Sequence, residues 1–251
     1  MRLDKELHKR ALAKSRTAAA ELIANSAVLV NGTVCNKPAQ IIGDDDVIEI
    51  CDSSLPETLR YVSRGGLKLE HALNTFEIAL DGKVCLDVGA STGGFTDCML
   101  KRRALRVYAV DVGTSQLDAS LRNNHRVVSH EQCDIRNFTP PENIDFIAAD
   151  VSFISLKLIL PSIAAFFHSC SYSCYYRNAI LLIKPQFELE KKHKGVVTDK
   201  KTAEKITASI ADFAEGLGFQ VKGLLESPVL GKSGNREFLM WVGYKQEWSI
   251  K

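Results

Sequence analysis

The chain has 251 residues, of which 45% are hydrophobic and 25% are charged, and its formal net charge is +2. These values indicate an ordinary soluble globular protein with one sizeable core and room for a small accessory domain. The charged first ten residues exclude a secretory signal peptide, which needs an apolar central region. The seven cysteines form no C-x-x-C pair, so we expect reduced thiols, no metal site and a cytoplasmic protein.

The first 52 residues predict a small α+β domain. Leu3 and Leu7 have helical spacing, and Ser15 is placed to cap a second helix. Asn31-Gly32 lies between two β-prone runs, which is the strongest short signal for a hairpin, and residues 44–50 ("DDDVIEI") predict a later strand. We therefore expect two short helices, a hairpin and one further strand.

This domain is also the basic part of the chain, because residues 1–40 contain seven Lys/Arg and only three acidic residues. Such charges can simply be solvated, or they can contact the phosphates of a nucleic acid. The order of residues 2–50 resembles the small αL RNA-binding module of a small-subunit ribosomal protein and of pseudouridine synthases. The resemblance implies that the second helix and the hairpin present side chains to folded RNA. The candidates are Arg2, Lys14, Ser15, Arg16 and Lys37, with Arg64 from the following segment.

A serine- and proline-containing stretch at 53–62 predicts a linker, after which the pattern changes. Five strand-like runs, mostly separated by helical stretches, occur in the domain expected at 63–251; they are 83–88, 106–112, 125–130, 144–151 and 178–184. This alternation predicts an α/β fold with a mostly parallel sheet and helices on both faces. Residues 219–229 and 236–244 predict an antiparallel hairpin at one edge.

A glycine-rich turn, "DVGASTGGF" at residues 87–95, follows the first of these strands. It does not fit the G-x-G-x-x-G pattern of dinucleotide sites, because an acid precedes its first glycine. Asp87, Asp111 and Asp134 each follow one of three successive strands. Carboxylates at strand ends often only cap turns, but three in register suit S-adenosylmethionine, with Asp111 on the ribose hydroxyls and Asp134 on the adenine amine. From the turn itself, the candidate cofactor-binding residues are Asp87, Gly89, Ser91, Gly93, Gly94 and Phe95.

Four further segments carry a resemblance to a known family: "SRGGLKLEHAL", "AADVSFISL", "LLIKPQFE" and "GKSGNREFLMW". Together with the glycine-rich turn, they resemble the TlyA family, ribosomal RNA ribose methyltransferases that are also described as hemolysins and whose catalytic domain is FtsJ-like. The resemblance covers nearly the whole chain and implies a Rossmann-like class I methyltransferase fold. It also implies a catalytic tetrad, carried here by Lys68, Asp150, Lys184 and Glu237. Asp134 departs from the family pattern, in which we expect asparagine or a variable residue.

The chemistry of ribose methylation gives these residue types a purpose. A ribose hydroxyl is a weak nucleophile, so its oxygen must be held in line and its proton drawn away. A lysine that loses its charge can take the proton, whereas a charged Lys184 can stabilise the developing alkoxide. The sequence leaves both roles open.

Other functions receive less support from the sequence. Residues 150–153 read "DVSF" where amino-methylating enzymes commonly carry Asn/Asp-Pro-Pro-aromatic, and no Pro-Cys pair is present for carbon-5 methylation of pyrimidines. A membrane-lytic protein is disfavoured because the best apolar stretch, 146–167, contains Asp150, Lys157 and Pro161. A non-catalytic RNA-binding assembly factor is the third class. The resemblance to the TlyA family implies that the substrate is a cytidine 2'-hydroxyl of ribosomal RNA in a ribosomal subunit. The chain looks like the shorter family members, which act on the large subunit. The exact nucleotide, a further role on the small subunit and the oligomeric state stay open.

Overall fold

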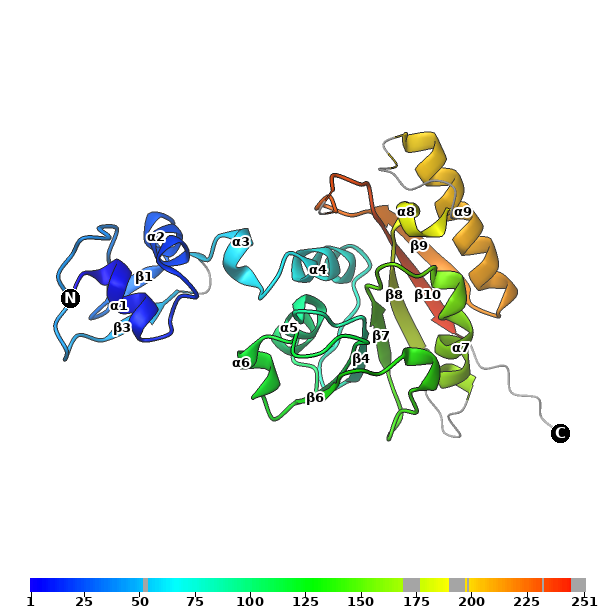
Figure 1. Cartoon of the computed structure of the whole chain (residues 1–251), viewed down its shortest axis with the longest axis horizontal. Helices are drawn as coiled ribbons and strands as arrows, with labels where there is room; N and C mark the ends of the chain where they lie inside the picture. Colours follow the sequence, from blue (N-terminus) through cyan, green and yellow to red (C-terminus); the bar gives the residue numbers. More distant parts are fainter. Residues whose placement is uncertain (52–53, 169–176, 190–196, 198, 232, 245–251) are drawn as a thin grey trace. The chain divides into compact units, whose positions relative to one another are not determined.

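A computed structural model describes residues 1–51, 54–168, 177–189, 197, 199–231 and 233–244. The chain divides into two compact units, Met1–Tyr61 and Val62–Lys251. The first unit is the smaller one, and the second contains a large central sheet (Figure 1).

The amino-terminal unit has the elements that its sequence predicts. They are α1 (Leu3–Lys9), α2 (Arg16–Ala24), β1 (Val28–Val30), β2 (Thr33–Val34) and β3 (Ile48–Ile50), with the strands in the antiparallel order β2-β1-β3. The predicted cap is confirmed, because the Ser15 hydroxyl accepts a hydrogen bond of 3.1 Å from the Ala18 N–H. The hairpin turn is confirmed too, with positive φ at both Asn31 (50°) and Gly32 (77°).

The stretch predicted to be a linker, residues 53–62, contains a short helix. Residues Glu57–Arg60 form the short helix α3. Leu55 and Leu59 pack against the core of the amino-terminal unit, whose centre includes the fully buried Leu3 and Leu7. Apolar contact therefore assigns this stretch to the first unit.

The second unit is built on a seven-stranded sheet with the order β6-β5-β4-β7-β8-β10-β9. Its strands are β4 (Val84–Val88), β5 (Arg106–Val110), β6 (Val127–His130), β7 (Phe146–Ala149), β8 (Arg177–Ile183), β9 (Gln220–Glu226) and β10 (Phe238–Tyr244). The five strands from β6 to β8 are parallel, and β10 pairs antiparallel with both β8 and β9. The predicted α/β fold with an antiparallel edge is confirmed.

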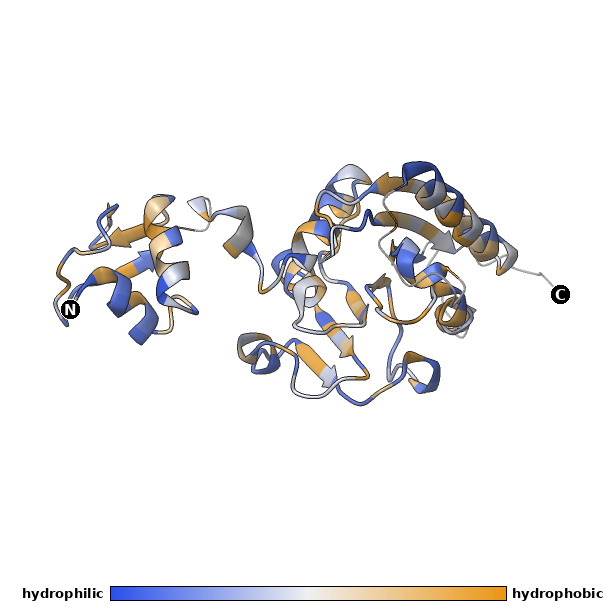
Figure 2. Cartoon of the chain, turned by 45° about the horizontal axis from the view of Figure 1, so that its top comes forward, coloured by the Kyte–Doolittle hydropathy of each residue, from blue (hydrophilic) through white to orange (hydrophobic). Residues whose placement is uncertain are grey.

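Helices cover both faces of this sheet (Figure 1). They are α4 (Gly65–Thr75), α5 (Gly94–Lys101), α6 (Ala119–Arg122), α7 (Leu160–His168), α8 (Pro185–Glu188) and α9 (Lys200–Gly216), with short 3-10 helices η2 (Ile135–Asn137) and η3 (Leu156–Leu158). Helix α9 buries Ala203, Thr207, Ile210 and Ala214, which recur at helical spacing, and turns hydrophilic residues outward (Figure 2).

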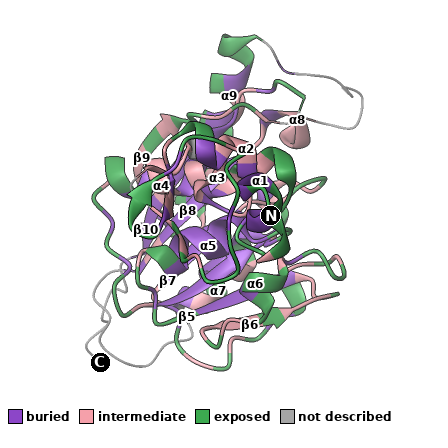
Figure 3. Ribbon diagram, turned by 90° about the vertical axis from the view of Figure 1, so that its left-hand side faces the viewer, coloured by how far each residue is buried: buried purple, intermediate pink, exposed green. Residues whose placement is uncertain are grey.

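Burial fixes which residues can form a site. The central parallel strands are buried on both faces, because every residue of β4 and β7 is buried. Figure 3 shows β7 in the colour of buried residues. Polar side chains that carry chemistry are therefore found where the strands end. In a parallel sheet the carboxyl ends of all strands lie on the same side, which we call the carboxyl edge. The loops that follow β4, β5, β7 and β8 begin there.

Candidate active site

Asp87 lies near the end of β4 and is fully buried (0% exposed). Its Oδ2 accepts hydrogen bonds from the backbone N–H (2.8 Å) and the hydroxyl group (2.6 Å) of Thr96 in α5. Burial raises the pKa of Asp87 to about 7, although the bonds from Thr96 oppose this shift. Asp87 therefore ties the end of β4 to the first turn of α5 from inside the protein.

The glycines of the turn after β4 permit close contacts. Gly89 has a φ of +81°, and a Cβ there would lie 2.7 Å from the carbonyl oxygen of Asp150. Gly93 has a φ of +93°, and a Cβ on Gly94 would lie 2.9 Å from the backbone nitrogen at the start of α4. Phe95 is buried, with only 3% of its surface exposed. These four residues set the path of the turn and bring α4, α5 and the β7 loop together.

Asp111 lies at the end of β5, on the rim of a small pocket. The pocket is formed at the ends of β4, β5 and β6, and its lining includes Ser91, Asp111, Gly113, Gln116 and His130. The carboxylate of Asp111 accepts hydrogen bonds from the N–H groups of Ser91 (2.8 Å) and Gly113 (2.7 Å). Asp111 and Ser91 are therefore held together in the lining of this pocket.

Asp134 is held differently from Asp111. Its side chain accepts hydrogen bonds of 2.9 Å from both the backbone N–H and Nε of Arg136, and this ion pair holds the pKa of Asp134 below its usual range. The described residues that line the pocket do not include Asp134. The third acid of the series thus already has a cationic partner.

Lys184 and Asp150 form one ion pair of the expected tetrad. Asp150 directly follows β7 and Lys184 directly follows β8, and their Oδ1 and Nζ atoms are 2.6 Å apart. The Lys184 ammonium also donates a hydrogen bond of 2.8 Å to the Ser152 hydroxyl. Only 11% of the Lys184 side chain is exposed, so its head group is fixed by these two contacts.

Lys68 and Glu237 form the other ion pair. Lys68 comes from α4 and Glu237 directly precedes β10, and a short charged hydrogen bond joins Nζ to Oε2. Both residues are buried, with 7% and 3% of their surface exposed. A lysine and a glutamate buried this deeply require each other, because removal of either would leave an unpaired charge.

The sheet brings the two pairs to one place. Phe238 of β10 is the register partner of Ile183 in β8, so Glu237 and Lys184 lie at the same edge. The first turn of α4 also approaches Asp150, since a Cβ on Gly65 would lie 3.8 Å from the Asp150 carboxylate. All four tetrad residues therefore belong to one cluster at the carboxyl edge of the sheet.

Two aromatic side chains beside this cluster were not found from the sequence. Phe153 is 91% exposed and has a φ of +66°, an unusual conformation for a bulky residue. Its ring centroid is 5.1 Å from that of Phe187, and Lys184 Nζ lies 5.9 Å from the Phe187 ring. The signal was present in "DVSF" and "KPQF", where each phenylalanine stands three residues after a tetrad member.

In the amino-terminal unit, two of the candidate RNA-binding residues share a buried acid. Asp4 accepts contacts from Arg2 (3.1 Å) and Arg16 (3.2 Å), and chiefly its hydrogen bond with Arg2 lowers its pKa to about 2. The Arg2 and Arg16 side chains are still 45% and 58% exposed. Their guanidinium groups are positioned by Asp4 and remain accessible from solvent.

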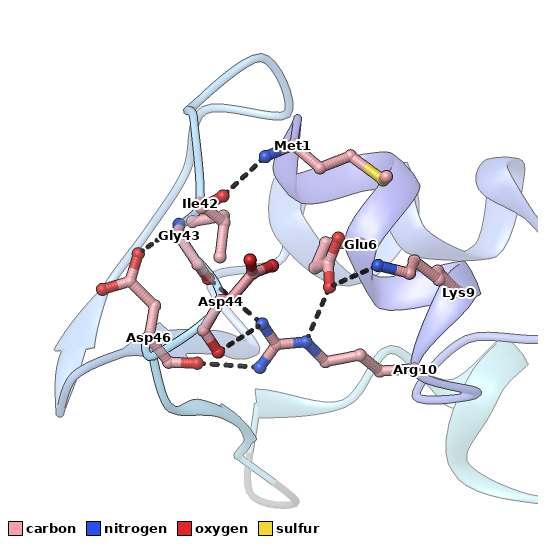
Figure 4. Close-up of polar contacts among 8 residues, drawn as sticks. All are labelled: Met1, Glu6, Lys9, Arg10, Ile42, Gly43, Asp44 and Asp46. Atoms are coloured by element: carbon pink, nitrogen blue, oxygen red, sulfur yellow. Dashed lines mark hydrogen bonds and ion pairs between the residues drawn. The ribbon is translucent and has the colours of Figure 1, made fainter.

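Arg10 has a structural position in the same unit. It donates hydrogen bonds to the Glu6 carboxylate (2.9 Å) and to the carbonyl oxygens of Asp46 (2.8 Å) and Gly43 (3.2 Å), as Figure 4 shows. These contacts tie α1 to residues 43–46. Part of the basic excess therefore stabilises the domain.

The remaining candidates for RNA binding lie on the surface. Lys14, Ser15 and Lys37 are exposed in the amino-terminal unit, where Ser15 also caps α2. Arg64 is exposed in the second unit, next to the first residue of α4. Arg64 is thus near the tetrad in the chain's fold, whereas the others belong to the separate unit.

Comparison with known proteins agrees with this geometry. Residues 61–244 match the FtsJ-like methyltransferase model, and residues 1–48 match the S4 domain. The chain is 41% identical to the 16S/23S rRNA (cytidine-2'-O)-methyltransferase TlyA of Mycobacterium tuberculosis, over 96% of this chain and 89% of that protein. The chain is a member of the TlyA family of FtsJ-like methyltransferases.

Two further relatives extend this assignment to a shorter protein and to a solved structure. The 23S rRNA (cytidine-2'-O)-methyltransferase TlyA of Campylobacter jejuni is 37% identical, over 96% of this chain and 98% of that protein. The solved structure of a Streptococcus thermophilus protein described as a hemolysin is 39% identical, with a TM-score of 0.69, and covers 98% of this chain and 89% of that one. This TlyA family member thus shares both units with its relatives.

None of the helices that the structure describes is both long enough and apolar enough to cross a membrane.

Proposed function

We propose that this TlyA family enzyme transfers a methyl group from S-adenosylmethionine to the 2'-hydroxyl of a cytidine in ribosomal RNA of the large subunit. The observation that carries the proposal is the cluster of two ion pairs, Lys184–Asp150 and Lys68–Glu237, at the carboxyl edge of the sheet. The relatives from M. tuberculosis and C. jejuni are named for this reaction. We propose that the enzyme works in the cytoplasm, where a ribosomal substrate would be met.

The cofactor-binding residues that we propose fit S-adenosylmethionine. Asp111 accepts two backbone N–H groups at the rim of the pocket, and its carboxylate has further lone pairs for ribose hydroxyls. Gly89 lets the turn pass where any Cβ would meet the β7 loop. Asp87 acts from behind the turn through Thr96, and Asp134 contributes least because Arg136 already pairs with it. When bound, S-adenosylmethionine supplies an electrophilic methyl group on a sulfonium centre.

Lys184 is the group that we assign to the ribose hydroxyl. As an amine, it carries two protons, one of which it donates to the Ser152 hydroxyl, and it lies 2.6 Å from the Asp150 carboxylate. Its lone pair can then take the proton of the 2'-hydroxyl. As an ammonium, its third proton can stabilise the oxygen while the hydroxyl proton leaves to solvent. Asp150 orients the head group in both cases. The pair Lys68–Glu237 holds α4 against the start of β10 and is the second ion pair of the proposed site.

Phe153 and the amino-terminal unit suit an RNA substrate. A nucleobase stacks favourably on an exposed aromatic ring, and Phe153 offers such a ring next to Phe187, which in turn lies beside Lys184. In the S4 domain, Arg2, Lys14, Ser15, Arg16 and Lys37 are the residues that we propose for holding folded RNA, with Arg64 on the catalytic unit. Phosphate contacts of this kind give affinity, while the catalytic unit selects the atom that is methylated.

The test uses ribosomal subunits that lack the modification. Purified protein is incubated with a donor carrying a labelled methyl group, and the RNA is digested to nucleosides for mass spectrometry. We expect 2'-O-methylcytidine from the large subunit. Label on a base, or no label in any RNA, would overturn the proposed reaction. A parallel leakage assay on anionic lipid vesicles separates this function from the lytic activity that the word hemolysin implies.

A further inference from the structure

Glu188, at the end of α8, joins two loops of the active site that lie far apart in the sequence. Its Oε1 accepts a hydrogen bond of 2.8 Å from the Leu156 N–H, and its Oε2 accepts a short hydrogen bond from the Ser155 hydroxyl. Ser155 caps η3 and Leu156 is its first residue, in the loop after β7, whereas Glu188 is the last residue of α8, which follows β8. The carboxylate thereby satisfies the first N–H of a helical turn, a group that otherwise has no partner within the turn.

The two loops that Glu188 joins carry the reacting groups. One loop holds Asp150 and Phe153, and the other holds Lys184 and Phe187. The contacts between them follow one another in order along both segments: Asp150 with Lys184, Phe153 with Phe187, and Ser155 with Glu188. Glu188 makes the last of these contacts. Of the two acids among these six residues, Asp150 belongs to the tetrad and Glu188 does not.

We infer that Glu188 is a positioning residue, a clasp that fixes the Asp150–Phe153 loop against the Lys184–Phe187 segment and so aligns Lys184 with the substrate. Glu188 is half-buried and touches neither the pocket lining around Asp111 nor, among the described residues, the tetrad itself. Its action is therefore expected on the rate of methyl transfer and not on cofactor affinity. The inference rests on the proposed role of Lys184.

The chemistry of the clasp distinguishes glutamine from alanine. In Glu188→Gln, the amide oxygen can still accept from the Leu156 N–H, and the amide N–H can donate to the Ser155 hydroxyl, which rotates to suit. In Glu188→Ala, both contacts are lost and the loops are free to separate. A displacement of about 1 Å in an aligned active site can cost on the order of 100-fold in rate.

The experiment compares full-length variants in methyl transfer to ribosomal subunits, with binding of S-adenosylmethionine by calorimetry and thermal unfolding measured alongside. We expect Glu188→Ala to lower kcat by about 10- to 100-fold with cofactor Kd unchanged within about twofold. Glu188→Gln should recover the rate to within about threefold of the wild type. Glu204→Ala, an exposed α9 glutamate paired only with Lys200 in the described residues, is the matched control and should behave as the wild type.

Three results would overturn the clasp: a normal kcat in Glu188→Ala, a Glu188→Gln enzyme as slow as the alanine variant, or loss of cofactor affinity together with activity. Ser155→Ala removes one contact without touching Glu188, and it should show a smaller loss of kcat that is not additive with Glu188→Ala. Lys184→Ala in the same assay separates the two proposals. If both Lys184→Ala and Glu188→Ala are active, the assigned role of Lys184 fails together with the clasp. If Lys184→Ala is inactive and Glu188→Ala has a normal rate, only the clasp is refuted.

Discussion

The ion pairs of the two units differ in the distance along the chain between their partners. In the S4 domain, Arg2 and Arg16 lie 2 and 12 residues from Asp4, and both arginines are about half exposed. In the catalytic unit, Lys68 and Glu237 are 169 residues apart and both are buried. Partners this close along the chain meet with little loss of chain entropy, so their pairing says little about function. A distant buried pair costs desolvation free energy, so it marks a candidate functional site.

Removing Lys184 is the strongest way to test this comparison. Lys184→Ala should reduce methyl transfer by at least ~10²-fold, because the substrate hydroxyl loses the group that handles its proton or charge. Cofactor binding should stay nearly intact, since Asp111 and its pocket lie at other strands. Lys200→Ala, on the outer face of α9, removes an exposed lysine and should leave the rate unchanged. Near wild-type transfer by Lys184→Ala, measured with a labelled methyl donor, would mean that the buried pair Lys184–Asp150 is only structural.

The buried Asp87 should make the stability of the catalytic unit depend on pH. Burial raises its folded pKa to about 7, above the value of about 4 expected in the unfolded chain. Its contribution to stability is therefore fully present below about pH 4 and is lost as the pH rises through 7, by roughly 3–4 kcal/mol. Asp87→Asn cannot ionise, so its unfolding free energy should be flatter over this range than that of the wild type. Denaturant unfolding at several pH values measures the difference, and identical slopes would contradict the buried acid.

Much of the fold could be predicted because it depends on local pattern. The buried strands, the Asn31-Gly32 turn and the Ser15 cap each follow from a few adjacent residues. The pairing inside the site could not be predicted in this way. Which lysine meets which acid is decided by the register of β8 with β10 and by the approach of α4 to the β7 loop. The exposure of Phe153 depends on a left-handed backbone that the sequence does not favour.

A count of charged residues also could not show which arginines of the amino-terminal unit have structural contacts and which face solvent. The sequence shows an excess of lysine and arginine, but only the fold separates Arg10, which binds backbone carbonyl groups, from Arg2 and Arg16, which face solvent beside Asp4. A helical spacing fixes the face on which a residue lies. It does not fix which carbonyl oxygens of residues 43–46 come within reach of that face.

The exposed basic residues of the amino-terminal unit offer a test of RNA affinity. Replacing Arg2, Lys14 and Arg16 together by alanine should weaken binding to ribosomal RNA and flatten the slope of log affinity against log salt by roughly two to three units if all three meet phosphates. Lys101→Ala, an exposed lysine of α5 in the catalytic unit, serves as the control. An unchanged slope would show that Asp4 already neutralises these side chains, and the local pairs would then have no part in binding.

The smallest effect is expected at two aspartates of the proposed cofactor site, Asp111 and Asp134, which differ in their partners. Asp111→Ala should weaken S-adenosylmethionine binding by roughly 1–3 kcal/mol, because backbone N–H groups hold its carboxylate at the rim of the pocket without neutralising its charge. Asp134→Ala should cost about 0.5 kcal/mol or less, since Arg136 already occupies that carboxylate. Arg136→Ala frees Asp134 from its ion pair and leaves the lining of the pocket beside Asp111 unchanged. If Asp134 can reach the adenine amine once it is freed, calorimetry should show tighter binding in Arg136→Ala than in the wild type, and this gain should vanish in the double variant. A large loss in Asp134→Ala alone would instead show that the Arg136 pair opens when the cofactor binds, and the local pair would then belong to the site after all.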